Sequence, residues 1–349
     1  MSIIKISDSI KIGTDYKPFI IAEMSGNHNQ SLEKAMNIVK AAADAGAHAI
    51  KLQTYTPDTI TIDHKGGLFD INDSKSLWKG RNLYDLYKEA MTPYEWHKPI
   101  FEYARELGII CFSTPFDESA VDMLDELGAP CHKIASFENN HHPLLKKIAS
   151  TGKPVIMSTG ISTLGDTEES VEVLRQNGCN DLVLLKCTST YPATPENTNL
   201  RTIPYLKDIF KCEVGLSDHT MGIGAAVAAI ALGARVIEKH FCLSRAEGGV
   251  DSAFSLEPHE FKLLVEETER AYLSLGGVQY GIQEAERASK NFKRSIYVVK
   301  DIKEGELFTA ENIRIIRPGD GLHPRYYEQL LGKPALKDFK RGMPLTTTI

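Results

Sequence analysis

Two histidines stand at the ends of strand-like runs: His219 ends GLSDH and His240 lies in IEKHF. Alternate residues of an extended run point to one side, so Ser217 shares a side with His219, and Glu238 shares one with His240. If the runs are neighbouring parallel strands about 4.8 Å apart, both imidazoles can bind one divalent metal and leave positions open for a Lewis-acid role. The spacing alone leaves open whether these histidines bind a metal or are satisfied by hydrogen bonds.

Two lysines in other apolar runs, Lys51 and Lys133, indicate an anionic ligand. Hydroxyl groups stand on similar runs at Ser136, Ser158 and Ser217. Ammonium groups and hydroxyls together suit a phosphate or a carboxylate. Two alternatives stay open: ordinary ion pairs with Glu23 or Glu138, and a lysine Schiff base of the aldolase kind.

The elements that must position these residues are eight short apolar, β-branched runs. The runs span 19–24, 49–55, 109–116, 131–136, 154–160, 182–188, 213–219 and 235–241. Segments of helical period lie between them, and two of these, 31–46 and 117–128, end in glycine, a common helix stop. The alternation predicts a (β/α)8 TIM barrel. A doubly wound open sheet is the alternative, but no GxGxxG motif follows the first strand.

Polar residues gather at the C-terminal ends of these runs, the face that holds the active site in a barrel. They are Glu23, Lys51, Gln53, Ser113, Thr114, Lys133, Ser136, Ser158, Lys186, Thr188, Ser217, His219, Glu238 and His240. A solvated surface does not explain such residues on every strand, so we expect a catalytic face here.

Three segments follow from the pattern: a catalytic barrel over 1–276, a polar linker over 277–291 and a small domain over 292–349 with turn-rich short strands. The last is too small for a large core of its own, so we expect it to pack on the barrel or on a partner subunit. The long insertion 56–108 is typical of a substrate lid or an oligomer contact.

Bulk composition excludes several classes of protein. The formal charge of −6 over 349 residues argues against a nucleic-acid partner. None of the six cysteines forms a CxxC pair, which predicts buried, reduced thiols. The N-terminus lacks the apolar core of a signal peptide, and the longest small-apolar stretch is too short for a bilayer. We therefore expect a soluble, cytoplasmic protein without a membrane partner.

Eight motifs, in order along essentially the whole chain, resemble the nonulosonic (sialic) acid synthases. They are IAEMSGNHNQSL, IKLQTYTPDT, CFSTPFD, KIASFEN, MSTG, YPATPENTNL, GLSDHT and VIEKHF. The segment YVVKDIKEGELFTAENIRIIRPGDGL resembles the antifreeze-like (SAF, β-clip) domain of that family.

The resemblance implies a metal-dependent transferase that condenses phosphoenolpyruvate, an N-acetylated amino sugar and water into a nine-carbon 2-keto acid and phosphate. A divalent metal, Mn²⁺ or Mg²⁺ with Co²⁺ as a further candidate, would sit on His219 and His240. Glu138 would be the acid/base and Glu23 a second catalytic carboxylate beside the sugar. The other residues implied around phosphoenolpyruvate are Lys51, Lys133, Thr114, Ser136, Ser158, Ser189 and Ser217. Those implied near the sugar are Gln53, Tyr191 and Asp251.

The resemblance also implies a homodimer with exchanged C-terminal domains. Arg317 of the RPGDG motif would reach the barrel of the partner subunit. This implication gives the small C-terminal domain a part in the site.

Within the family, AEMSGNHNQS, KIASFE and LWKGRNLYDLYKEA resemble the pseudaminic acid synthases. The implied sugar is 2,4-diacetamido-2,4,6-trideoxy-altrose. The alternatives are an N-acetylneuraminate or legionaminate synthase and, more distantly, a Schiff-base pyruvate aldolase. Phe137 stands where other members have glycine beside Glu138, and we expect its ring to narrow or dry that side of the site.

Overall fold

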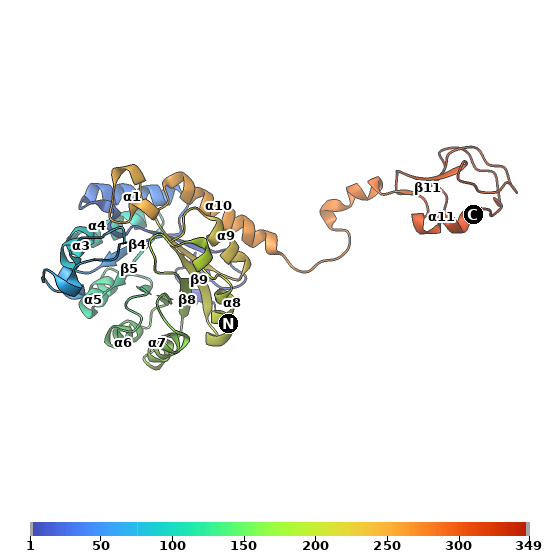
Figure 1. The fold of residues 1–349 in the computed structure, drawn as a ribbon. Coiled ribbons are helices and arrows are strands. Elements are labelled where there is room, and N and C mark those ends of the chain that lie inside the picture. Colours follow the sequence, from blue (N-terminus) through green and yellow to red (C-terminus); the bar gives the residue numbers. More distant parts are fainter. Residues whose placement is uncertain (1–2, 75, 347–349) are drawn as a thin grey trace. The chain divides into compact units, whose positions relative to one another are not determined.

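The computed structural model describes residues 3–74 and 76–346, and the chain divides into two compact units, one up to Gly276 and one from Gly277 (Figure 1). Residues 1–2, 75 and 347–349, at the ends of the predicted domains and within the insertion, lie outside the described residues. Each unit is described by itself.

The first unit is a closed barrel of eight parallel strands in chain order, with β10 pairing back to β3. Its strands are β3 Phe19–Glu23, β4 Ala49–Thr54, β5 Ile110–Pro115, β6 His132–Ile134, β7 Val155–Ser158, β8 Leu182–Cys187, β9 Glu213–Asp218 and β10 Val236–His240. The predicted barrel is confirmed, and the alternative of an open sheet is wrong.

Helices surround this barrel (Figure 1). The longer ones are α1 Leu32–Asp44, α4 Tyr94–Glu106, α5 Glu118–Glu126, α6 His142–Ser150, α7 Leu164–Gln176, α8 Thr202–Phe210, α9 Gly224–Ala231 and α10 Pro258–Leu275. The first of them shows how local sequence sets its bounds: the Ser31 side chain accepts a hydrogen bond from the Lys34 amide, and Gly46 follows with φ of +83°. Its buried face is Ala35, Ile38, Val39 and Ala42, at helical spacing.

A short antiparallel hairpin, β1 Ile4–Lys5 and β2 Lys11–Ile12, precedes the barrel. Its isoleucines join the inward side chains at the N-terminal end of the barrel strands in one apolar cluster. Members from the strands include Phe19, Ile21, Ala49, Phe112, Cys131, Ile156, Val183, Leu185 and Val236. Residues of the opposite parity pack under the helices in a separate, larger core. The barrel interior is therefore apolar at its N-terminal end.

The predicted insertion after β4 is a folded element. It contains α2 Pro57–Ile60 and α3 Leu83–Ala90. Asn82 organises it: the amide donates to the carbonyl oxygens of His64 and Phe69 and to the Asp70 carboxylate, and the side-chain oxygen caps α3. Such a network holds the segment in one conformation over the C-terminal side of β4.

The second unit pairs β11 Ser295–Val298 with β12 Ile313–Ile316 and carries the short helix α11 Tyr327–Leu330. Its small core includes Ile296, Val298, Phe308, Ile313, Phe339 and Leu345. Arg317 lies directly after β12, before Pro318. Among the described helices, none is long and apolar enough to cross a bilayer.

Candidate active site

The inward positions become polar toward the C-terminal end of the strands. On β3, Glu23 follows the buried Ile21, and in register it faces Lys51 of β4 on one side and His240 of β10 on the other. Glu238 of β10 is likewise in register with Ser217 of β9. Parity and register together bring residues that are distant in sequence into one interior layer.

Lys51 lies at the centre of this layer. Its Nζ is 2.5 Å from a carboxylate oxygen of Glu23, 3.1 Å from the Thr114 hydroxyl and 3.9 Å from Glu238. Burial opposes the charge, but the two carboxylates raise the pKa of Lys51 above its ordinary value. Burial in turn raises the pKa of Glu23 to about 7, although Lys51 opposes this. The ion-pair alternative left open for Lys51 and Glu23 is thus seen in the structure.

Lys133 makes a second cationic position next to the first. Its Nζ donates to the Ser158 hydroxyl at 2.8 Å and to the Ile134 carbonyl at 3.1 Å, and it lies 3.6 Å from Glu238. Glu238 also accepts from Ser217 at 3.3 Å, while its other oxygen is buried with no hydrogen-bond partner in the described part of the chain. Glu238 thus lies between two ammonium groups, and an anionic ligand that binds here would compete with its carboxylate for both of them.

Gln53, Ser25 and Asp251 form a polar wall beside Glu23. The Gln53 amide donates to Glu23 at 2.9 Å and to the Ser25 hydroxyl at 3.1 Å, and Ser25 donates to the Asp251 carboxylate. Burial raises the pKa of Asp251. Asp251 follows β10 in a loop, so this wall joins the first and last strands of the barrel.

His219 and His240 lie side by side, with ring centroids 5.3 Å apart. Nδ1 of His219 is 3.0 Å from the Thr188 carbonyl oxygen, which only accepts, so Nδ1 carries a proton and Nε2 is the nitrogen that has a lone pair in the neutral ring. Nδ1 of His240 is buried without a hydrogen-bond partner among the described residues, 3.8 Å from an Asp251 oxygen. Two available ring nitrogens beside a carboxylate fit a divalent metal with open positions.

Aromatic rings close this side of the layer. The Tyr191 ring centroid lies 4.5 Å from that of His219 and 6.4 Å from that of His240. Phe254 lies 4.8 Å from His240, and Trp78 of the insertion lies 5.7 Å from Tyr191. The insertion therefore contributes a ring to the edge of the candidate site.

Ser136 and Ser189 flank a close approach at Gly160. The Gly160 amide donates to the Ser136 hydroxyl at 3.1 Å. A Cβ at Gly160 would meet the Ser189 hydroxyl oxygen at 2.2 Å and the Ser136 hydroxyl oxygen at 2.6 Å. Only glycine fits here, and the two hydroxyls stay close together.

Glu138 lies in the loop after β6, with one carboxylate oxygen buried and unpartnered among the described residues. Burial raises its pKa to about 7, although Lys133 and Lys51 oppose this. The neighbouring Phe137 is 58% exposed, so this ring does not supply the drying that the sequence suggested. The burial of Glu138 comes from the barrel mouth itself.

Two strand-end residues of the barrel, Ser113 and Lys186, do not point into this layer. Ser113 bonds Thr54 at 2.6 Å, and Thr54 bonds His97 of α4, so Ser113 belongs to the outer layer. Lys186 bonds the Cys187 carbonyl and the Thr188 hydroxyl. Arg317 lies in the second unit, so its predicted approach to a barrel stays a prediction.

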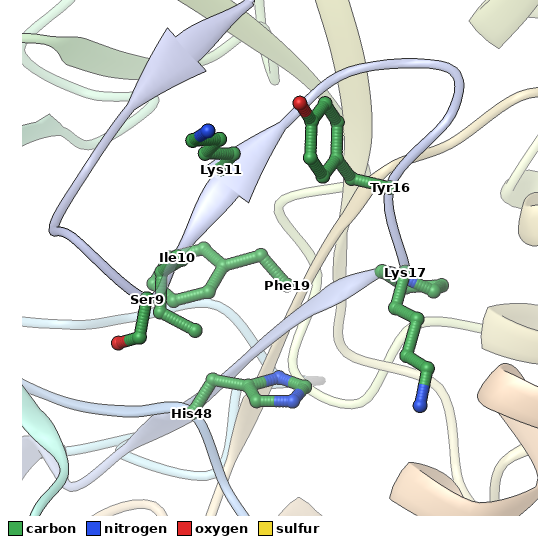
Figure 2. A pocket seen from close by; sticks show the side chains of 8 residues that line it. Ser9, Ile10, Lys11, Tyr16, Lys17, Phe19 and His48 are labelled. Atoms are coloured by element: carbon green, nitrogen blue, oxygen red, sulfur yellow. The ribbon is translucent and has the colours of Figure 1, made fainter.

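One further cavity and one further cluster lie away from this layer. Figure 2 shows the lining of a 290 Å³ cavity at the N-terminal end of the barrel. Its basic groups already have partners: Lys17 pairs with Glu269 at 2.6 Å, Lys11 lies over the Tyr16 ring, and His48 accepts a backbone hydrogen bond at 2.9 Å. A cluster of three potential metal ligands at the start of α10, Glu257, His259 and Glu260, contains two carboxylates paired with Arg245. These features have local structural explanations.

Two residues of the layer were given no role from the sequence. Glu238, expected at the catalytic face as one of the polar strand-end residues, contacts both lysines. Ser25 links Gln53 to Asp251, but a serine in a loop carries no comparable signal.

The chain matches two family models. The NeuB family matches residues 38–280, and the SAF domain matches residues 293–348. The pseudaminic acid synthase of Campylobacter jejuni subsp. jejuni serotype O:2 is 49% identical over 329 residues, which cover 94% of this chain and 95% of that protein. The N,N'-diacetyllegionaminic acid synthase of the same strain is 38% identical over 328 residues, with 93% and 97% covered.

A solved structure agrees with these matches. The N-acetylneuraminic acid (sialic acid) synthetase of Leptospira borgpetersenii serovar Hardjo-bovis, in complex with citrate, superimposes with a TM-score of 0.73 at 33% identity. The superposition covers 82% of this chain and 95% of that one. The resemblance seen in the motifs is confirmed: the chain belongs to the NeuB family of sialic acid synthases, with a TIM barrel followed by a SAF domain.

Proposed function

We propose that this chain is a pseudaminic acid synthase. It condenses phosphoenolpyruvate, 2,4-diacetamido-2,4,6-trideoxy-altrose and water into pseudaminic acid and phosphate. The observation that carries the proposal is the combination of two buried ammonium groups and a histidine pair in one barrel layer, Lys51 and Lys133 beside His219 and His240. The first pair suits a doubly anionic enol phosphate, and the second suits an aldehyde activated by a metal.

Phosphoenolpyruvate is held by charge and hydroxyl groups. Lys51 and Lys133 bind its carboxylate and phosphate, since preorganised charge in a water-poor site stabilises a reacting anion most strongly. The hydroxyl donors are Thr114, Ser136, Ser158, Ser189 and Ser217. Glu23 and Glu238 keep both ammonium groups in place before the ligand arrives.

The open-chain sugar lies beside Glu23, Gln53, Tyr191 and Asp251. His219 and His240 would hold a divalent metal, Mn²⁺ or Mg²⁺ with Co²⁺ as a further candidate, which supplies Lewis-acid polarisation of the aldehyde oxygen. The Tyr191 ring packs against His219, with centroids 4.5 Å apart. Arg317 of a partner subunit completes this side in a homodimer with exchanged SAF domains.

The bond changes balance without a redox partner. Carbon 3 of phosphoenolpyruvate bonds to the aldehyde carbon, whose oxygen takes up a proton and becomes a hydroxyl. Water adds to carbon 2 while Glu138 accepts its proton. The tetrahedral intermediate then loses its carbon-2 hydroxyl proton as its C–O bond breaks, and phosphate leaves with the bridging oxygen, so the two protons of water end on the new hydroxyl and on phosphate. A base whose pKa is raised to about 7 by burial is well matched to this proton transfer.

The geometry disfavours a Schiff base at Lys133. Burial lowers the pKa of Lys133, which by itself favours a neutral amine. However, Ser158, the Ile134 carbonyl and Glu238 surround its Nζ at 2.8, 3.1 and 3.6 Å, an acceptor for each proton of an ammonium group. Borohydride with pyruvate should therefore trap no adduct.

A phosphate-release assay with a panel of sugars tests the proposal. The panel holds the 2,4-diacetamido altrose, its mannose epimer and N-acetylmannosamine. We expect the altrose to be preferred, as the 49% and 38% identities to the two Campylobacter synthases suggest. Preference for the epimer would favour the legionaminate alternative, and preference for N-acetylmannosamine would favour the N-acetylneuraminate alternative.

Oxygen-18 in the bridging position of phosphoenolpyruvate tests the bond that breaks. The label should appear in phosphate, and label in the keto acid would contradict C–O cleavage. Arg317→Ala should slow turnover without unfolding the barrel, and Lys186→Met is the control at a strand-end lysine outside the layer.

A further inference from the structure

Each histidine of the pair follows a charged residue that points the other way. Asp218 precedes His219 and Lys239 precedes His240, and the alternation of a strand turns them to the outer side of the barrel. Asp218 and Lys239 are register partners of β9 and β10, and their Oδ2 and Nζ atoms are 2.7 Å apart. Their exposed fractions are 2% and 1%, so the pair is wholly buried.

The pair also holds the backbone after His219. Asp218 Oδ1 accepts from the Thr220 amide at 2.9 Å and from the Thr220 hydroxyl at 2.8 Å, and Lys239 donates to the Thr220 carbonyl at 2.6 Å. The Ala193 amide donates to the His219 carbonyl at 2.9 Å, and Ala193 bridges Thr220. The peptide groups on both sides of Thr220, the first of which carries the His219 carbonyl, are therefore held by hydrogen bonds.

Stability does not explain these charges. The outward positions next to them, Leu216 on β9 with Ile237 and Phe241 around β10, belong to the apolar core under the helices. A buried ion pair in such a layer is often no more stable than apolar residues of the same volume, because desolvation offsets the attraction. What the pair supplies and leucine cannot is directional bonding that fixes two strand ends against each other.

We infer that Asp218 and Lys239 are positioning residues for the histidine pair. They fix the strand ends that carry His219 and His240 relative to each other, and with them the spacing of the two rings, whose centroids lie 5.3 Å apart. This inference rests on the proposed function for the histidines as metal ligands. It adds that metal affinity depends on a buried pair that touches neither the metal nor a substrate.

The test is Mn²⁺ titration of the metal-free full-length protein by calorimetry, with thermal unfolding of the same samples. The double variant Asp218→Leu/Lys239→Met replaces the pair by apolar groups. We expect it to keep the melting temperature of the metal-free protein and to weaken Mn²⁺ binding about 10–100-fold, the usual loss when support behind a ligand is removed. If the double variant folds poorly, Asp218→Asn takes its place. This substitution keeps the shape of the side chain and should also weaken Mn²⁺ binding.

The control is a matched ion pair at the other end of β9. Lys207 of α8 lies 3.0 Å from Glu213 at the start of β9, and Lys207→Met/Glu213→Leu should leave Mn²⁺ affinity unchanged. A role in stability alone would lower the melting temperature of the Asp218/Lys239 variant with unchanged affinity in the folded protein, and this outcome overturns the inference. A different result would contradict the proposed function itself: His219→Ala binds Mn²⁺ as tightly as the parent protein does. His219 would then not be a metal ligand, and the inference would fall with that assignment.

Discussion

At the N-terminal end of the barrel, the inward side chains include Ile21, Ala49 and Val236, whereas two residues further along the same strands stand Glu23, Lys51 and Glu238. The N-terminal layer is apolar and closed from below by a hairpin. The C-terminal layer buries carboxylates, ammonium groups and imidazoles. The same strands thus enclose an apolar interior at one end of the barrel and a polar interior at the other.

The difference separates the end of the barrel that stabilises the fold from the end that carries the reactive groups. Unpartnered buried polar atoms of the described residues concentrate at the C-terminal layer, on Glu138, Glu238 and His240. Such groups cost folding free energy and are tolerated where chemistry needs them. Burial of apolar surface at the N-terminal layer offsets that cost. Substitutions at the N-terminal end should therefore lower stability, whereas those at the C-terminal end should lower turnover.

The largest expected effect is kinetic, at the C-terminal layer. Glu138→Gln removes the proposed proton acceptor, and we expect turnover to fall about 10²–10⁴-fold. Stability should hold or rise, because a buried carboxylate oxygen without a partner is replaced by a neutral group. Steady-state phosphate release and urea unfolding measure the two quantities. A variant that unfolds easily yet keeps its turnover would reverse the comparison.

The next effect is on stability, at the N-terminal layer. Ile12→Ala removes buried hairpin surface under the barrel, which should lower the free energy of unfolding by about 2–5 kcal/mol. Turnover per folded molecule should not change, because the apolar layer separates this residue from the polar one. Ile12→Val, with an expected loss of about 0.5–1.5 kcal/mol, is the graded control. A selective loss of turnover would mean that the two layers are coupled.

The smallest expected effect is a pH dependence of stability that comes from Glu138. Burial raises the pKa of Glu138 from 4.5 to about 7, so the folded state binds its proton more tightly than the unfolded state does. The associated stabilisation is complete below about pH 4.5 and is lost as the pH rises through 7, in total about 1–3 kcal/mol.

Urea unfolding of the parent and of Glu138→Gln across this pH window tests the prediction. The parent should lose stability relative to the variant as the pH rises. Parallel stability curves would show that Glu138 is as well solvated in the folded state as in the unfolded chain.

The barrel and much of its polar layer could be predicted because both follow from period and parity. His219 and His240 meet since they lie at the same height on adjacent strands. The contact of Ser25 with Asp251 could not be predicted, because two loops more than 200 residues apart meet only after the barrel closes. That Ser113 faces the outer layer could not be predicted either, because a polar residue near a strand end does not by itself say which side it faces.

The buried cysteines can report on local opening of the barrel. Cys131 lies in the apolar cluster at the N-terminal end, and Cys187 lies beside His219 at the other end. A thiol-alkylating reagent reaches a buried sulfur only when the surrounding structure opens. The rates at which these two sulfurs are modified in the native protein, each divided by the rate for the same thiol in the unfolded chain, would therefore record which end of the barrel opens more readily.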